Sequence, residues 1–205
     1  MWFGLAMGML LGALWALPAA FLKVYRGVHE VISTIMLNWI AFFFVLWLVV
    51  GPPYANPNDP PNKTIRIPPQ SARLPLIGNT DLSIAAPIAI IVAILVYYLL
   101  WHTTFGFGMR ASGLNQKAAR YGGVNPPKSA IIWSFIIGGI TSGLGGAMKV
   151  MGEPPPTYAI SQGMANIYGL GFDGIGGVSL VGRNHPLGII LSAMFFGMLR
   201  AGTPP

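Results

Sequence analysis

The sequence has no cysteine and very little charge. Only 8% of its 205 residues are Asp, Glu, Lys or Arg, whereas a typical soluble domain has about a quarter. The absence of cysteine excludes a disulfide framework and zinc sites built from thiolates. So few charges cannot cover a water-facing surface, and 54% of the residues are hydrophobic, with a mean hydropathy of +0.63. The composition therefore indicates a membrane protein.

Sequence motifs for catalysis and for nucleotide binding are also lacking. The chain contains no His-Glu-x-x-His, no Gly-x-Ser-x-Gly and no phosphate-binding Gly-x-x-x-x-Gly-Lys-Ser/Thr pattern. Its three histidines, His29, His102 and His185, lie far apart in the sequence. We therefore expect no enzyme, no metal site and no cofactor in this chain, and any ATPase must be a separate chain.

What charge there is has one dominant sign, with a net charge of +7. In a soluble protein this excess would favour nucleic acid as a partner. Here Lys and Arg fall between apolar runs, where membrane topology and anionic headgroups place them. We expect contact with membrane lipid and none with nucleic acid.

Six apolar segments are separated by more polar gaps. A spanning helix needs about 20 apolar residues; four segments reach that size and two shorter ones follow. The first segment has no basic residues before it, which favours a membrane helix over a cleaved signal peptide, although Pro18-Ala19-Ala20 resembles a cleavage site. The expected fold is an all-α, polytopic helix bundle forming one transmembrane domain over residues 1–205. The predicted membrane segments are residues 1–22, 33–50, 84–101, 129–148, 166–181 and 186–199.

The gaps between these segments predict the topology. Lys and Arg are denser in the first, third and fifth gaps than in the second and fourth, and basic gaps face the cytoplasm. Residues 103–128 are therefore expected to be cytoplasmic, and the proline-rich residues 51–83 are expected to form an outer loop. The chain begins inside an apolar run and stops soon after another, so we expect a fragment of a longer protein.

Small residues recur every four positions in two of the segments. Gly4, Gly8 and Gly12 share one helical face, Gly139 and Gly143 form a similar pair, and Ser142 pairs with Gly146. In lipid this spacing lets helix backbones approach closely. It predicts a tightly packed bundle.

Two polar residues stand inside apolar segments. Asp173 lies in residues 166–181, a glycine-interrupted segment about 24 Å long at 1.5 Å per residue, which is shorter than the roughly 30 Å core of a bilayer. A carboxylate there predicts a broken or re-entrant helix beside a solute pathway, or alternatively a helix cap near the interface. Asn38 needs a hydrogen-bond partner on another helix or a polar solute.

The gap after Trp101 is much less apolar than its flanks. Asn115–Tyr121 is predicted to be a short helix, with Lys117 and Arg120 at helical spacing. An exposed helix between two spans is suited to docking on a soluble partner. The alternative is an ordinary basic loop anchored to lipid headgroups.

Three stretches together resemble a known family. They are residues 27–38, residues 107–124 with Arg-Ala-x-Gly-x-Asn and Ala-Ala-x-Tyr, and residues 171–175 followed by 180–188. The chain resembles permease subunits of ABC importers for nucleosides and simple sugars, which are related more distantly to ribose and branched-chain amino-acid permeases. The family's earlier and later helices are not in this sequence.

The resemblance implies a multi-pass plasma-membrane subunit that imports a nucleoside or a similar small polar solute by alternating access. It implies three protein partners: a cytoplasmic ABC ATPase, a second permease subunit and an extracytoplasmic solute-binding protein. Residues 103–128 would be the ATPase-coupling loop, with Arg110, Ala111, Gly113, Asn115, Lys117, Ala118, Ala119, Arg120, Tyr121 and Gly122 as its coupling residues. The candidate translocation pathway comprises Ser33, Thr34, Asn38, Asn166, Phe172 and Asp173.

Two other functions remain open on the sequence. An oligomeric ion or solute channel would use Asp173 as a lining residue and would conduct without ATP. A non-transporting membrane scaffold would need only the glycine packing faces.

Overall fold

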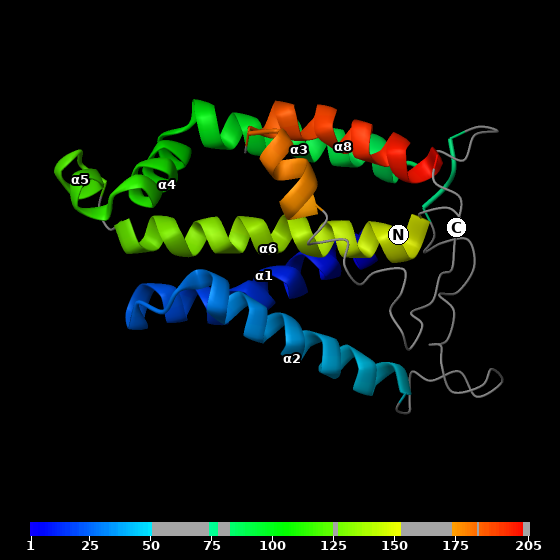
Figure 1. Ribbon diagram of the computed structural model, residues 1–205, viewed down its shortest axis with the longest axis horizontal. Helices are drawn as coiled ribbons and strands as arrows, with labels where there is room; N and C mark the ends of the chain where they lie inside the picture. Colours follow the sequence, from blue (N-terminus) through cyan, green and yellow to red (C-terminus); the bar gives the residue numbers. More distant parts are fainter. Residues whose placement is uncertain (51–73, 78–82, 125–126, 153–173, 184, 203–205) are drawn as a thin grey trace.

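The described part of the chain is an all-helical bundle. The computed structural model describes residues 1–50, 74–77, 83–124, 127–152, 174–183 and 185–202 (Figure 1). Within these residues the only β-type pairing is an isolated bridge between Leu76 and Ser83. The elements are α1 (Trp2–Arg26), α2 (Glu30–Val50), α3 (Ala85–His102), α4 (Thr104–Leu114), α5 (Gln116–Tyr121), α6 (Pro127–Gly152), the π-helix η1 (Gly174–Ser179) and α8 (Pro186–Gly202).

Four helices of the described part are long and apolar enough to cross a membrane. They are Trp2–Arg26, Glu30–Val49, Ala85–His102 and Lys128–Gly152, and a shorter apolar helix covers Pro186–Leu199. Large apolar side chains such as Phe3, Phe43 and Leu95 are exposed along them, as expected where lipid rather than water is the solvent. The prediction of an all-α, polytopic membrane bundle is confirmed.

The fifth predicted segment, residues 166–181, is described only from Gly174 onward. Its first eight positions, with Asp173 among them, lie outside the described residues. Gly174–Ser179 is a π-helix. This form is rare in proteins overall, but where it occurs it is often at a functional site. Whether the whole segment is broken or re-entrant stays a prediction.

Helices α1 and α6 are in backbone contact along their glycine faces, and Figure 1 shows them lying against each other. A Cβ atom added at Gly8 would lie 2.9 Å from the carbonyl oxygen of Gly143, and one added at Gly12 would lie 2.8 Å from the Cα of Gly143. The predicted packing of these faces is confirmed. A Cβ atom at Gly146 would meet no described atom within 4 Å, so this glycine takes no part in a described helix contact.

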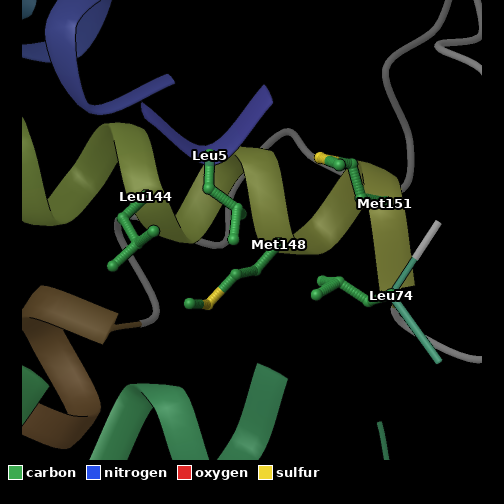
Figure 2. Close-up of a cluster of buried hydrophobic side chains, with 5 residues drawn as sticks. All are labelled: Leu5, Leu74, Leu144, Met148 and Met151. Atoms are coloured by element: carbon green, nitrogen blue, oxygen red, sulfur yellow. The ribbon is translucent and has the colours of Figure 1, made fainter. Parts of the chain in front are cut away.

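A cluster of buried apolar side chains joins α1, α6 and the segment before α3. Figure 2 shows its members: Leu5, Leu74, Leu144, Met148 and Met151. The Leu74 N–H donates to the Met151 carbonyl at 3.1 Å, and the Leu74 side chain is only 2% exposed. Residues 74–77 belong to the predicted outer loop, and Leu74 is thus anchored on the end of α6.

Leu74→Ala is expected to lower the stability of this end of the bundle. Replacing a buried Leu by Ala costs about 2–5 kcal/mol through lost contacts and the cavity left behind. The midpoint of thermal unfolding in detergent should therefore fall. Leu76→Ala, at a side chain that is 49% exposed two positions later, should leave the midpoint nearly unchanged. Equal midpoints for the two variants would show that Leu74 does not anchor the segment.

Candidate functional site

The predicted coupling loop folds into two short helices at one end of the bundle. Figure 1 shows α4 and α5 at the end of the bundle where α6 begins, with α5 lying beyond the N-terminal end of α6. A single extended residue, Thr103, separates α3 from α4, and a single residue, Asn115, separates α4 from α5. We call these two short helices the α4–α5 hairpin. Most of residues 103–128 is therefore helical rather than loop.

The corner between α3 and α4 is held by its own hydrogen bonds and by backbone contact. The Thr103 hydroxyl accepts from the Gly106 N–H at 3.0 Å and donates to the Leu99 carbonyl. A Cβ atom at Gly106 would lie 2.5 Å from the Cα of Leu100 and would overlap the Leu99 carbonyl oxygen. Because backbone atoms meet here directly, α4 has little freedom to move independently of the end of α3.

Asn115 starts α5 as its N-cap. Its side-chain oxygen accepts from the N–H groups of Lys117 at 2.9 Å and Ala118 at 3.2 Å, which satisfies donors that the first turn of a helix leaves free. The helix ends where the Gly122 N–H donates to the Ala118 carbonyl at 2.9 Å. The predicted short helix over Asn115–Tyr121 is confirmed, and Asn115 has a structural role in it.

An apolar groove runs between the two helices of the hairpin. Its volume is about 240 Å³, and its lining is almost entirely apolar. Two large apolar side chains of the hairpin, Leu114 and Tyr121, are 90% and 94% exposed. The residues that line the groove are Phe107, Ala111, Leu114, Asn115, Ala118, Ala119, Gly122 and Val124.

Basic side chains surround this end of the bundle. Lys117 and Arg120 are exposed on α5, and Arg26 is exposed at the end of α1. The single acidic residue among the described positions, Glu30, forms an ion pair with Lys23. The exposed charge next to the apolar groove is therefore positive.

Arg110 differs from the other basic residues of the hairpin because it lies on an aromatic ring. Its guanidinium carbon is 5.0 Å from the centre of the Trp101 ring, a cation–π geometry. The Trp101 ring is in turn 4.9 Å from the His185 ring and 5.6 Å from the Tyr97 ring. This cluster was not predicted from the sequence, although Tyr97 and Trp101 are four residues apart, on one face near the end of a predicted helix, and were an available signal.

Ser33, Thr34 and Asn38 from the predicted pathway all lie on α2. The Ser33 and Thr34 hydroxyls donate to the Glu30 carbonyl at 3.0 Å and 2.9 Å, and Asn38 is exposed. The hydroxyls are thus bonded to their own helix. The other three candidates, Asn166, Phe172 and Asp173, lie outside the described residues, so the assignment of a pathway stays a prediction.

The turn between η1 and α8 is compact. The Ser192 hydroxyl of α8 donates to the Val178 carbonyl of η1 at 2.7 Å, and Ser192 is buried. A Cβ atom at Gly182 would lie 2.8 Å from the carbonyl carbon of Gly188. The first turn of α8 therefore packs directly on the end of the preceding helical segment.

The sequence matches one protein family over almost its whole length and is similar to several known permeases. Residues 1–204 match the family described as "Branched-chain amino acid transport system / permease component". The chain is 34% identical over 196 residues to the "Guanosine ABC transporter permease protein NupP" of Bacillus subtilis (strain 168), covering 93% of this chain and 53% of that protein. It is 31% identical over 204 residues to the "Nucleoside ABC transporter permease protein NupB" of Lactococcus lactis subsp. cremoris (strain MG1363), covering 96% and 54%.

A more distant relative is the "Glucose ABC transporter permease protein TsgB13" of Haloferax volcanii, 27% identical over 202 residues, covering 93% of this chain and 51% of that protein. No solved structure matches the chain. The chain spans about half the length of these curated relatives. Since the family match covers residues 1–204, the chain belongs to the permease component family of the branched-chain amino acid transport system.

Proposed function

We propose that the chain is a membrane-spanning permease subunit of an ATP-driven importer in the plasma membrane, and that its solute is a nucleoside or a similar small polar molecule. The observation that carries the proposal is the α4–α5 hairpin, which presents an apolar groove and exposed basic side chains at one end of an apolar bundle. The names of two relatives support the solute class, since they contain guanosine and nucleoside.

The hairpin is the docking site for a separate cytoplasmic ATPase in this proposal. Exposed apolar side chains such as Leu114 and Tyr121 gain by leaving water when a protein covers them. Lys117 and Arg120 would meet acidic groups of the partner and orient it. A lipid-anchored loop accounts for the charges but not for the groove, which is why we favour docking.

The orientation follows from the same charges. Lys23, Arg26 and the basic residues of the hairpin lie in the first and third gaps, so these gaps would face the cytoplasm. The six predicted segments within residues 1–205 would then form one transmembrane domain, and residues 51–83 would face outward to the solute-binding protein. A second permease subunit would complete the pathway, to which Asn38 and Asp173 are assigned as lining residues. ATP-driven closure of the ATPase would move the hairpin and open the pathway to alternate sides of the membrane.

Arg120→Glu in the complete transporter should reduce the amount of ATPase that copurifies with the permease by tenfold or more. The reason is that reversal of an exposed charge at a complementary interface replaces attraction by repulsion. Arg26→Glu is the matched control, because Arg26 is exposed at the same end of the bundle but on α1. If the basic residues only anchor lipid headgroups, the two variants would behave alike and the docking proposal would be wrong. Solute flux that persists without ATP would favour a channel instead.

A further inference from the structure

One side chain at the end of α3 touches both the α4–α5 hairpin and the turn before α8. The indole of Trp101 carries the Arg110 guanidinium of α4 at 5.0 Å. The same indole lies 4.9 Å from the His185 ring, centre to centre. Tyr97, one turn earlier on α3, stacks on Trp101 and lies 5.4 Å from His185. A continuous set of ring contacts therefore joins α4 to the start of α8.

The backbone groups of His185 are hydrogen-bonded to residues on both sides of it in the sequence. Its N–H donates to the Gly182 carbonyl at 3.0 Å, and its carbonyl accepts from the Ile189 N–H at 2.9 Å. Beyond it, the hydrogen bond from Ser192 to the Val178 carbonyl ties α8 to η1. The backbone that carries the His185 ring is therefore part of the hydrogen-bonded connection between η1 and α8, and the ring itself is held by its contacts with Tyr97 and Trp101.

The other end of the contact set is equally constrained. The Thr103 hydrogen bonds and the backbone contact at Gly106 fix α4 to the end of α3. A displacement of the hairpin would thus reach Trp101 directly, because only Thr103 separates α3 from α4 and no flexible linker lies between the two helices.

We propose that Trp101 is a positioning residue that transmits movement of the α4–α5 hairpin to the η1–α8 turn. The inference rests on the proposed function, because it takes the hairpin to be the element that the ATPase moves. It adds a route from that element to the glycine-rich segment that precedes α8, and it assigns Arg110 to this route rather than to direct ATPase docking.

The absence of cysteine from the sequence makes a direct test practical. Spin labels on cysteines at Gln116 of α5 and Leu10 of α1 report the hairpin, and labels at Leu187 and Leu10 report the start of α8; all three positions are exposed. Distances are measured in the complete transporter by double electron–electron resonance, with and without trapped ATP. In the otherwise unaltered chain we expect both distances to shift. In Trp101→Leu we expect the Gln116 shift to persist and the Leu187 shift to be lost.

Two further variants separate transmission from general packing. Trp101→Phe keeps a ring for both contacts and should restore most of the Leu187 shift. Trp133→Leu is the matched control: its ring contacts Phe105 of α4 at 5.8 Å, and it should leave both shifts in place. Arg110→Gln should reduce the Leu187 shift, and adding it to Trp101→Leu should have no further effect, because both act through one contact.

The outcomes distinguish the two proposals. A Leu187 shift that survives Trp101→Leu, or one that is lost equally in Trp133→Leu, would overturn the role of Trp101. A Leu187 distance that never shifts while the Gln116 distance does would overturn it as well. No shift at Gln116 in the otherwise unaltered chain would instead count against the hairpin as the element moved by the ATPase. If Trp101→Leu does not fold, Arg110→Gln takes its place as the test. A reduced Leu187 shift in that variant supports the role of Trp101, and an unchanged shift overturns it.

Discussion

Gly143→Ala is expected to prevent α1 and α6 from packing and to abolish the recovery of folded, monodisperse protein. The added Cβ would lie 2.9 Å from the carbonyl carbon of Gly8, overlap its oxygen, and lie 3.1 Å from the Cα of Gly12. Overpacking costs about 1–3 kcal/mol when side chains can shift. Here the obstructing atoms are backbone, so we expect a cost at or above that range. Lipid offers no compensating hydrophobic drive between helices.

Gly146→Ala is the matched control for this experiment. It makes the same change on the same helix, but its Cβ would meet no described atom within 4 Å. Ala favours a helix over Gly by about 1 kcal/mol, so this variant should be as stable as the parent or more so. The measurements are yield, gel-filtration profile and thermal unfolding midpoint in detergent. Similar losses in both variants would refute the glycine contact as the basis of α1–α6 packing.

The parts of the fold that the sequence predicts are those set by local pattern. The length of an apolar run determines whether a helix can cross a bilayer, and the spacing of Gly8, Gly12, Gly139 and Gly143 determines which faces allow close approach. The pattern does not say which face meets which. The pairing of α1 with α6 therefore comes only from the structure, as does the position of Leu74, whose partners lie far away in sequence.

For the candidate site as well, the sequence predicts local features but not contacts between distant residues. The composition after Trp101 and the position of Asn115 predict an exposed short helix, because cap and periodicity are local features. The helix α4 was not predicted, because its glycines weaken the helical pattern. In the structure the start of α4 is stabilised by its N-cap Thr103, whose side chain accepts a hydrogen bond from the Gly106 N–H. The contact between Trp101 and His185 could not be predicted, because the two residues are 84 positions apart in sequence and meet only through the packing of α8 on α3.

Gly106→Ala should displace the hairpin from the bundle while leaving the α1–α6 core folded. A Cβ at Gly106 would overlap the Leu99 carbonyl oxygen and lie 2.5 Å from the Cα of Leu100, so α4 would have to swing away from α3. That movement breaks the Thr103 cap and separates Arg110 from Trp101. We expect faster amide hydrogen exchange throughout α4 and α5 and at least a tenfold loss of copurifying ATPase, equivalent to about 1.4 kcal/mol.

Gly108→Ala provides the comparison, because Gly108 is also a buried glycine of α4. Its Cβ would lie 3.5 Å from a Val124 methyl group, which is an ordinary contact distance. Hydrogen exchange and ATPase binding should therefore stay close to those of the parent. If Gly106→Ala also leaves them unchanged, the corner is not held by backbone contact, and α4 is free to move without α3. Loss of protection in α1 and α6 as well would show that the hairpin and the core unfold as one cooperative unit, and not that the corner opens locally.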